Sequence, residues 1–561
     1  MNSASPAARG SSGRWWALAA IGASVLVVGL DLTVLNLALP TIAGTLHAST
    51  GDLQWISDSY SLVLAVVMLP AGMLGDRFGR KKVMLIALAV FLLSSVACAY
   101  SSSVGELIAA RCLLGLGAAA IFPLALSVLP VLFRREEMGS AIAVVSATTM
   151  LSFPVGPIVG GYLLDHFWWG AVFLINVPVV LIALVAVVFL LPESRSSARL
   201  TVDFAGLIVS SAGLAALTYG FIRAGQDGWG SGVALGAMLA GAVTGVAFVA
   251  LERRIARSGR HPLVDLRLFQ SAGFRWGTIL ATVVSFAMFG LLFAMPQYFQ
   301  EVRGADALGS GIRLLPLIGG MLVGMIGGRR LTEARRGPGG TRRPAVAGAR
   351  GLVAAGYLIM TIGLALGALT RASSSTGYAA AWIAVAGLGL GLVMPSAMNV
   401  ALGELSAERS GSGSALISAL RQVGATIGVA ILGTLVSNGY TAALGGALHG
   451  VPGGAAAAAR GSVAGGVAVA RQLGSPSLLA SVQAAFVHGM DMMLWTCGGI
   501  ALAAALLAAV FLPRRGAAGA GPATGLAADP ALAVAPLVAT GPRGDGEQVD
   551  GPATEQAEST P

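Results

Sequence analysis

Three charged residues stand inside long apolar runs of this sequence. Asp31 lies in GLDLTVLNLALP at 29–40, Asp58 in WISDSYSLVLA at 55–65, and Arg111 in LIAARCLLGLG at 107–117. A charged side chain at the centre of a lipid bilayer costs about 2.5 to 3.5 kcal/mol on insertion scales. Each of the three therefore needs an opposite charge, a water-filled cavity or a chemical role. A carboxylate beside an arginine could take up and release a proton.

The runs around these residues have the length of membrane-spanning helices. The 561 residues are 56% hydrophobic and only 11% charged, and apolar segments of about 20 residues recur, enough to cross a hydrocarbon core of about 30 Å. No segment shows the strict alternation of a membrane β-barrel strand. We expect an all-α polytopic membrane protein, and its first run is too long for the core of a signal peptide. The fourteen predicted spans are 15–39, 53–74, 83–101, 106–130, 140–163, 171–191, 204–222, 231–251, 276–299, 307–328, 351–370, 378–400, 413–437 and 486–512.

Positive charge predicts the orientation of these spans. An even number of spans places both termini on one side, and Lys and Arg concentrate in cytoplasmic loops. Of the 35 basic residues, 27 fall on the side of the termini and six on the other, while Arg111 and Arg421 lie within spans. We therefore expect a multi-pass protein of a bacterial cytoplasmic membrane with both termini inside. The net charge of +10 then reflects topology and requires no nucleic-acid partner.

With this orientation the three charges fall at similar depths. Span one runs outward and carries Asp31 about 24 Å beyond Trp15, at 1.5 Å per residue. Asp58 and Arg111 each lie about five residues from the outer end of a span that runs inward. One hypothesis is a proton-coupling site of Asp31, Arg111 and Asp58. The alternatives are a static buried ion pair between Asp31 and Arg111, and an Asp58 that only caps or lines the outer mouth.

The chain contains an internal repeat. GMLGDR at 72–77 reappears as GMIGGR at 324–329, and VGPIVGG at 155–161 aligns with VGATIGV at 423–429. Glycines at such spacing allow close helix contacts. When the two copies are aligned, Ala287 corresponds to Asp31 and Gly328 corresponds to Asp76. The acidic residues therefore belong to the first copy only. The predicted domains are a cytoplasmic N-terminus at 1–14, a six-helix bundle at 15–192, an inserted helix pair at 203–251, a second bundle at 275–512 with a long flexible outer loop at 438–485, and a disordered cytoplasmic tail at 513–561.

The first half of the chain contains four motifs in order: LDLTVLNLALP at 30–40, GMLGDRFGRKK at 72–82, LIAARCLLGLG at 107–117 and SFPVGPIVGG at 152–161. Together they resemble the signatures of the major facilitator superfamily. Fourteen spans and the WISDSYSLVLA segment resemble its fourteen-helix drug:proton antiporter branch. The resemblance implies the major facilitator fold of two six-helix bundles. It also implies an intracellular latch and an antiporter motif in span five. The latch residues are Gly72, Gly75, Asp76, Arg77, Gly79 and Arg80, and the motif residues are Gly156, Pro157, Gly160 and Gly161.

The residues of these motifs also have simpler interpretations. The latch glycines would let the chain turn tightly, and Asp76 could cap the next helix or pair with an arginine. Arg77, Arg80, Lys81 and Lys82 could be topology signals alone.

Possible secondary sites lie in the second copy. Asp491 and His488 are one helical turn apart and could share a proton or form a water-exposed pair. Some cation-handling relatives carry a glutamate near Ile417 or Ser418, which is absent here beside Arg421, so the resemblance leaves room for neutral or anionic substrates.

These observations predict a transporter and no enzyme. We find no catalytic or nucleotide-binding motif, and Cys98, Cys112 and Cys497 lack metal-ligand spacing. We expect a proton-coupled efflux antiporter that works as a monomer and exports hydrophobic small molecules such as antibiotics by alternating access. It would use the proton motive force and no cofactor or metal. The alternatives are export of a physiological metabolite or self-made natural product, a non-transporting membrane sensor or receptor, and uptake by symport.

Overall fold

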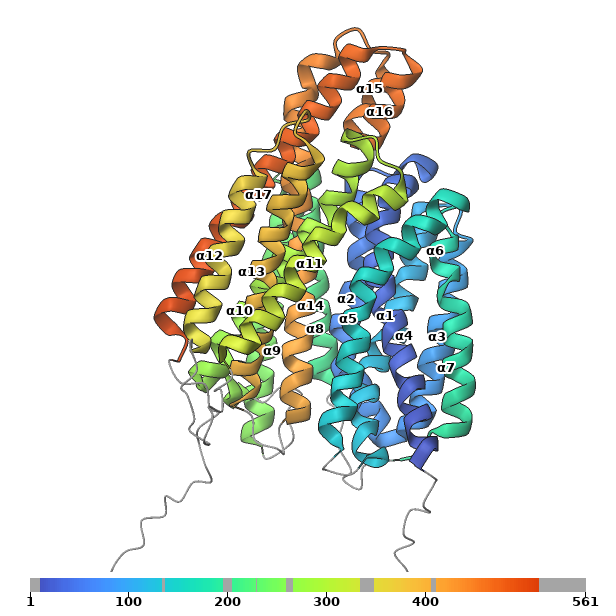
Figure 1. Ribbon diagram of the computed structural model, residues 1–561, viewed down its shortest axis with the longest axis vertical. Helices are drawn as coiled ribbons and strands as arrows, with labels where there is room; N and C mark the ends of the chain where they lie inside the picture. The colour runs from blue at the N-terminus through green and yellow to red at the C-terminus, as the bar shows by residue number, and fades with distance from the viewer. Residues whose placement is uncertain are drawn as a thin grey trace, which may run out of the picture. The chain divides into compact units, whose positions relative to one another are not determined.

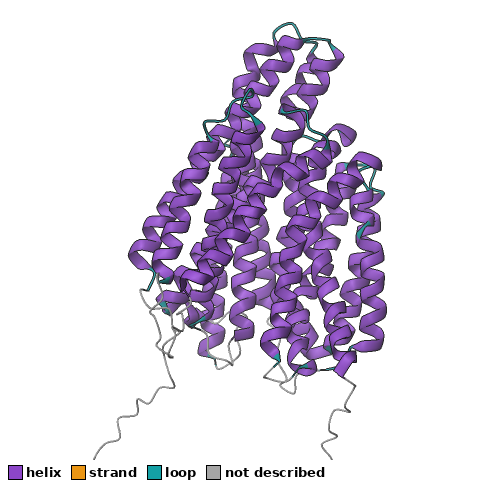
Figure 2. Cartoon of the chain, viewed as in Figure 1, coloured by secondary structure: helices purple, strands orange, loops and turns teal. Residues whose placement is uncertain are grey.

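The described part of the protein is helical throughout. The computed structural model describes residues 11–133, 137–194, 204–228, 230–258, 266–332, 348–404 and 410–513, and Figure 2 shows only helices and their connections there. We call residues 11–194 the first half, 204–258 the middle pair and 266–513 the second half. The predicted tail at 513–561 lies, apart from its first residue, outside the described residues.

The helices follow one another along the chain as Figure 1 shows. Those of the first half are α1 (Ser11–Leu46), α2 (Thr50–Phe78), α3 (Arg80–Ala99), α4 (Val104–Leu132), α5 (Met138–His166), α6 (Ala171–Leu174) and α7 (Asn176–Leu190). The middle pair is α8 (Phe204–Asp227) and α9 (Gly232–Arg257). The second half contains η1 (Leu266–Gln270), α10 (Ala272–Gln297), η2 (Tyr298–Val302), α11 (Ala307–Thr332), α12 (Ala349–Gly367), α13 (Thr376–Leu402), α14 (Ser410–Leu444), η3 (Gly445–Leu448), α15 (Gly453–Gly461), α16 (Val463–Gln472) and α17 (Pro476–Phe511).

Each of the fourteen predicted ranges overlaps a helix, and 171–191 overlaps both α6 and α7. Eleven helices in the described ranges are long and apolar enough to cross a membrane, and α8 adds a shorter apolar stretch, Ile208–Ala224. Large apolar side chains such as Leu93, Phe189 and Val246 face outward, as expected of lipid contact. The prediction of an all-α polytopic membrane protein is confirmed, whereas the number of fourteen spans stays a prediction.

Local sequence sets several helix starts. At α2 the Ser49 hydroxyl accepts a hydrogen bond from the Asp52 amide, and the Asp52 carboxylate accepts one from the Ser49 amide. This reciprocal arrangement satisfies donors that a helix start leaves free. The Ser103 hydroxyl caps α4 by accepting from the Glu106 amide, and Ser475 caps α17 directly before Pro476.

The internal repeat reappears as equivalent helix packing. In the first half α5 packs on α1, where Gly156 and Gly160 lie against Thr33 and Val34. In the second half α14 packs on α10, where Gly424 and Gly428 lie against the backbone of Thr282 and Phe286. A side chain at any of these glycines would collide with the neighbouring helix. The predicted correspondence between the two glycine pairs is therefore confirmed by their packing.

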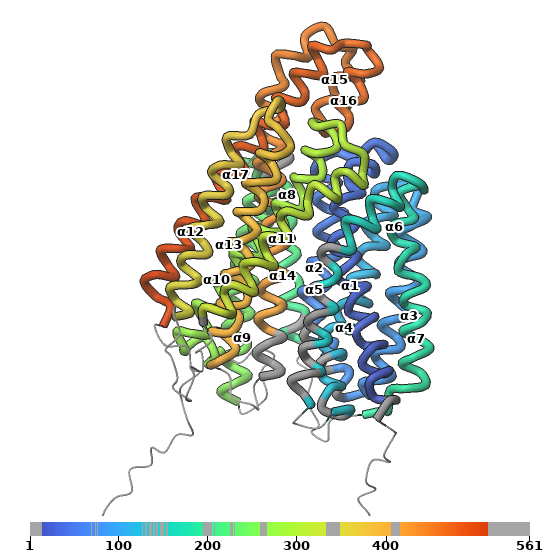
Figure 3. The backbone as a smooth tube through the Cα atoms, in the orientation of Figure 1, coloured from blue at the N-terminus to red at the C-terminus, as the bar shows by residue number. Residues whose placement is uncertain are grey.

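The two halves meet along a seam formed by related helices. Helix α2 packs against α14, and α11 packs against α5. The middle pair lies beside this seam, because α8 contacts both α2 and α14 and also packs on α9. In Figure 3, α8 and α14 run between the α1–α7 group and the α10–α13 group.

The expectation of a flexible outer loop at 438–485 is wrong. Helix α14 continues to Leu444, α15 and α16 follow, and α17 starts at Pro476. The buried Tyr440 hydroxyl donates to the carbonyls of Ala459 (2.7 Å) and Ser462 (3.3 Å), which ties α15 to α14. Alanine is the strongest helix former, and it makes this Ala- and Gly-rich segment helical although the segment lacks long apolar side chains. We call the end of the molecule that carries α15 and α16 the cap end (Figure 1).

Candidate functional site

Asp31 and Arg111 form a buried ion pair inside the first half. The Arg111 Nη1 donates to the Asp31 Oδ2 at 2.5 Å, which joins α1 to α4. Asp31 is 4% exposed and Arg111 is 1% exposed. An isolated charge at this depth would be expensive, and mutual neutralisation removes most of that cost. The pairing expected from the sequence is present, while its role in proton coupling stays a prediction.

Further polar groups hold Arg111 in place. Its Nε donates to the carbonyl of Ile56 at 3.2 Å, and its guanidinium lies over the Tyr60 ring, 4.4 Å from the centroid. Gly115 allows this approach of α4 to α2, because a Cβ there would lie 2.6 Å from the Tyr60 carbonyl oxygen. The guanidinium is thus fixed by a carboxylate, a carbonyl and an aromatic face.

A polar group from α7 completes this cluster. The Asn176 side chain interacts with the Asp31 carboxylate and donates from Nδ2 to the Ser95 hydroxyl at 3.1 Å. Ser95 in turn donates to the carbonyl of Phe173 at 2.9 Å. Sequence analysis missed Tyr60, Ser95 and Asn176. Asn176 carried a usable signal, because it is a polar residue within the apolar run at 171–191.

Asp58 lies on another face of α2. Gln54, one turn earlier, donates from Nε2 to the carbonyl of Ala430 in α14 at 3.2 Å. Asp58 therefore points toward the seam with α14, since residues four apart share a helix face. It is fully buried, and neither carboxylate oxygen has a hydrogen-bond partner among the described residues. The structure thus does not bring Asp58 to the Asp31–Arg111 pair.

The latch segment differs from the expected turn. Gly72 and Gly75 lie within α2 and pack on α4, where a Cβ at Gly75 would meet the Leu124 side chain at 2.1 Å. Helix α2 continues through them because they serve close packing, and the chain turns only at Gly79, whose φ is 114°. The prediction of a tight turn at Gly72 and Gly75 is therefore wrong.

The basic part of the latch segment contacts the end of α7. The Arg80 amide donates to the Ser194 carbonyl at 2.9 Å, and the Lys81 Nζ donates to the Val188 carbonyl at 2.6 Å. The Glu193 carboxylate, which sequence analysis missed, accepts from the Lys81 amide at 3.3 Å. Arg77 is exposed, with its guanidinium over the Phe78 ring. The Asp76 side chain lies outside the described part, so its predicted role stays open to test.

The antiporter motif in α5 faces two neighbours. Gly156 and Gly160 meet α1 of the same half, as described above. Gly161 and Pro157 meet α11 of the other half. A Cβ at Gly161 would lie 2.5 Å from the Leu308 Cα, and a Cβ at Gly311 would lie 2.3 Å from the Pro157 carbonyl oxygen. The motif would be expected to place Gly156, Pro157 and Gly160 at the seam between the halves; of these only Pro157 lies there, and Gly156 and Gly160 face α1 of their own half. Alternate faces of one glycine-rich helix serve the two contacts.

Asp165 fastens the seam at the cap end. Its two carboxylate oxygens accept hydrogen bonds from the Ala307 and Leu308 amides, each at 3.0 Å, at the start of α11. A carboxylate at a helix start satisfies free amides and complements the helix dipole. Gln300 adds a second contact between the halves, donating from Nε2 to the Leu37 carbonyl at 2.9 Å. Neither residue was identified from the sequence.

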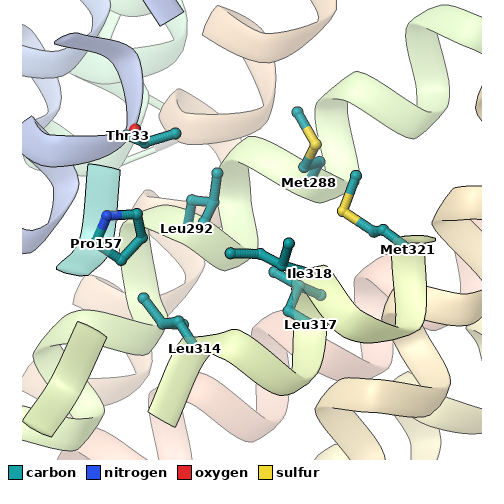
Figure 4. A pocket seen from close by; sticks show the side chains of 8 residues that line it. All are labelled: Thr33, Pro157, Met288, Leu292, Leu314, Leu317, Ile318 and Met321. Carbon is teal, nitrogen blue, oxygen red and sulfur yellow. The ribbon is translucent and has the colours of Figure 1, made fainter. Parts of the chain in front are cut away.

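A small apolar pocket of about 10 Å³, room for about one water molecule, lies between the halves next to this seam. Figure 4 shows Thr33 and Pro157 from the first half facing residues of α10 and α11. The lining residues are Thr33, Pro157, Met288, Leu292, Leu314, Leu317, Ile318 and Met321. The lining is almost wholly apolar and includes two methionines, whose flexible side chains can rearrange if the halves move apart. The described residues include no cluster that could hold a metal ion.

The secondary residues of the second half are separated from one another. His488 is exposed, Asp491 is half-buried, and no hydrogen bond or ion pair joins them in the described ranges. The two side chains thus make no contact through which they could share a proton as predicted. Arg421 lies between three helices: its Nε donates to the Ser285 hydroxyl at 3.3 Å, and its Nη2 lies 3.7 Å from the Met394 sulfur.

Two related helical halves around a seam, with an ion pair buried in one of them, define the class of membrane transporters built from repeats. Residues 21–429 match the Major Facilitator Superfamily, and the chain belongs to this family. The fold agrees with that of a solved transporter structure. A bacterial homologue of the human lysosomal transporter Spinster, 16% identical, aligns with a TM-score of 0.63 over 90% of this chain and 99% of its own.

Similar curated proteins are named for resistance and efflux. The tetracenomycin C resistance and export protein of Streptomyces glaucescens is 37% identical, covering 77% of this chain and 78% of the relative. The multidrug efflux pump LfrA of Mycolicibacterium smegmatis is 33% identical over 89% of this chain and 96% of its own. A probable actinorhodin transporter of Streptomyces coelicolor is 32% identical over 75% and 72%.

Proposed function

We propose that this protein exports apolar small molecules, antibiotics among them, in exchange for protons. The observation that carries the proposal is the buried Asp31–Arg111 pair in a chain of this family, whose relatives are named for resistance and efflux. A buried carboxylate opposite one arginine can exist with its proton bound or with its ion pair formed. A change in water access can switch it between these forms.

The proposed cycle assigns the cap end to the outside, in agreement with the positive charge on the side of the termini. When the halves separate at the cap end, Asp31 binds a proton from outside and releases Arg111. The halves then close around Asp165 and the start of α11, as the structure has them. The proton leaves inward, Asp31 pairs with Arg111 again, and substrate enters the pocket from the cytosol or the inner leaflet.

The finer features of the sequence analysis belong to this proposal. They are fourteen spans of the drug:proton antiporter branch, the predicted domain boundaries, a monomer in the bacterial cytoplasmic membrane, and no cofactor besides the proton gradient. Asp58, buried and unbonded at the seam, would be a second proton site or would meet a cationic substrate.

Transport by the purified full-length protein tests this function. Proteoliposomes are loaded with a fluorescent drug such as ethidium, and the outside is made more acidic than the inside. Protons that flow in should then drive the drug out. We expect drug flux that requires both the protein and the gradient, and that a protonophore abolishes. Flux that ignores the gradient would contradict antiport, and no flux for a panel of apolar drugs would contradict efflux.

A second candidate is export of a natural product made by the same cell. It is favoured by relatives whose printed names concern tetracenomycin C and actinorhodin. Deleting the gene distinguishes the two. A general efflux pump should leave the strain sensitive to many unrelated compounds, whereas a dedicated exporter should change only the secretion of one product and the resistance to it.

A further inference from the structure

Arg421 is a cation in the interior of the second half with no acidic partner. It stands eleven residues into α14, about 16 Å along the helix axis from Ser410. In the described residues no carboxylate forms an ion pair with it, and its hydrogen-bond partners are the neutral Ser285 hydroxyl and the Met394 sulfur. Arg111, the buried arginine of the first half, has Asp31 as its counterion. In the described part of the second half, Arg421 therefore lacks the neutralisation that Arg111 has in the first.

An unpaired arginine at such a depth is costly and needs water or an anion. The guanidinium has five N–H donors, of which the two contacts above use one at Nε and one at Nη2. None of its nitrogens is an enclosed, unbonded atom, and the side chain is partly exposed. Free donors thus remain accessible to a ligand.

The position of Arg421 next to the apolar pocket indicates what that ligand is. Its partner Ser285 and the pocket residue Met288 are three positions apart on α10, and so share one face of that helix. The same face continues to Leu292, and Met321 of α11 lies in the same lining. The pocket as the structure has it is too small for a drug-sized molecule, so a substrate would occupy it only after the halves move apart, with the Arg421 contact at Ser285 one turn of α10 from the lining residue Met288.

We infer that Arg421 is the anion-binding residue of the substrate site, and that the chain takes apolar molecules carrying a carboxylate or an acidic phenol. This inference deepens the proposed function and rests on it for the pocket's role as the transport site. A guanidinium binds a carboxylate through paired hydrogen bonds. The substrate would supply the negative charge that Arg421 lacks among the described side chains in contact with it.

A matched pair of ligands tests the inference on the full-length protein in nanodiscs. The probes are anthraquinone-2-carboxylate and the neutral anthraquinone-2-carboxamide, which share one flat apolar body. At pH 8 we expect the wild-type protein to bind the carboxylate about tenfold more tightly, as a charge-assisted hydrogen bond allows. Equal affinities, or no binding of the carboxylate, would overturn the inference without any variant.

Variants then assign the preference to Arg421. Arg421→Gln should bind both probes equally, and Arg421→Lys should keep part of the preference because it keeps the charge. The matched control is Arg371→Gln, which removes one positive charge from an exposed position of the same half. A preference that survives in Arg421→Gln would place the anion elsewhere and overturn the assignment.

Failure of this inference differs from failure of the proposed function. Proton-driven export of neutral and cationic drugs, with no preference for the carboxylate, would overturn only the anion site. Preferential binding of the carboxylate with no proton-driven flux of any drug would overturn only the transport function.

Discussion

At the scale of single residues, the two buried aspartates of the first half differ in their surroundings. Asp31 has Arg111 as a partner, whereas Asp58 has no hydrogen-bond partner in the described part of the chain. Breaking a buried ion pair costs about 3 to 5 kcal/mol, because the other charge stays buried. A buried polar group without a partner itself costs about 1 to 3 kcal/mol. The same substitution should therefore lower the free energy of unfolding at position 31 and raise it at position 58.

We predict that Asp31→Val destabilises the protein by about 3 kcal/mol or more, while Asp58→Val stabilises it by about 1 kcal/mol or more. Valine is close to aspartate in size and removes the carboxylate in both cases. Thermal unfolding in one detergent, followed by intrinsic fluorescence, measures both changes. A fall in the unfolding midpoint for Asp58→Val as large as that for Asp31→Val would show that Asp58 has a stabilising partner after all.

The sequence predicted the Asp31–Arg111 pair but not the groups that surround it. Depth along a helix follows from residue counting, and it placed both charges at similar levels. The side of the helix on which a residue lies cannot be found by counting in this way when the helix is apolar on all sides. For this reason depth alone groups Asp58 with the pair. Tyr60 and Ile56 face Arg111, while Asp58 faces α14.

At the scale of elements, glycines determine where the two halves approach. In α11, Gly311 meets the backbone of Pro157 in α5, whereas a Cβ added at Gly319 would have no neighbour within 4 Å. The repeat in the sequence predicted the α1–α5 and α10–α14 contacts. It did not predict which glycines form the seam, because one small-residue run serves two helix faces. The helical cap at 438–485 was missed since its apolar surface is built from small residues.

We predict that Gly311→Val lowers the rate of transport by at least about tenfold, because a backbone contact cannot yield as a flexible side chain would. Gly319→Val, in the same helix, should transport at nearly the wild-type rate. Drug efflux from cells with matched protein levels provides the measurement. Equal rates for the two variants would mean that the α5–α11 contact is not needed in the cycle.

The Asp165 cap at the start of α11 makes a second prediction at this scale. Asp165→Ala should weaken closure at the cap end by about 0.5 to 2 kcal/mol, the usual cost of losing a helix cap. A cysteine introduced at Thr41, which lines the polar hollow beside Asp165, should then react several-fold faster with a maleimide that cannot cross membranes. The control is Asp306→Ala, which removes a cap on Gly309 within the second half. If both variants react alike, Asp165 does not fasten the seam.

At the scale of the whole molecule, two related halves and a middle pair give a symmetrical frame with an asymmetric charge distribution. The first half holds a neutral ion pair, and the second holds the unpaired Arg421. The family and the helical fold were predictable from motifs and apolar length, because both depend on local sequence. The closed contact between the two halves at the cap end was not predictable, since it depends on residues more than a hundred positions apart in the sequence.

Topology gives a whole-molecule prediction. With fourteen spans, both termini lie in the cytoplasm and the cap end lies outside. Green fluorescent protein fused at either terminus should fluoresce, and alkaline phosphatase inserted between α16 and α17 should be active. Active phosphatase fused after residue 513 would place the C-terminus outside and would contradict the assignment of the cap end.

The central claim is that Asp31 couples substrate export to proton entry, and Asp31→Asn tests it most directly. Everted vesicles allow two measurements on one preparation: proton-driven uptake of substrate, and exchange of labelled for unlabelled substrate without a gradient. We predict that Asp31→Asn loses driven uptake by about a hundredfold, within the range of proton-transfer contributions, yet retains exchange. Driven uptake at the wild-type rate would contradict the account, and loss of both activities in a properly inserted protein would leave the pair a structural one.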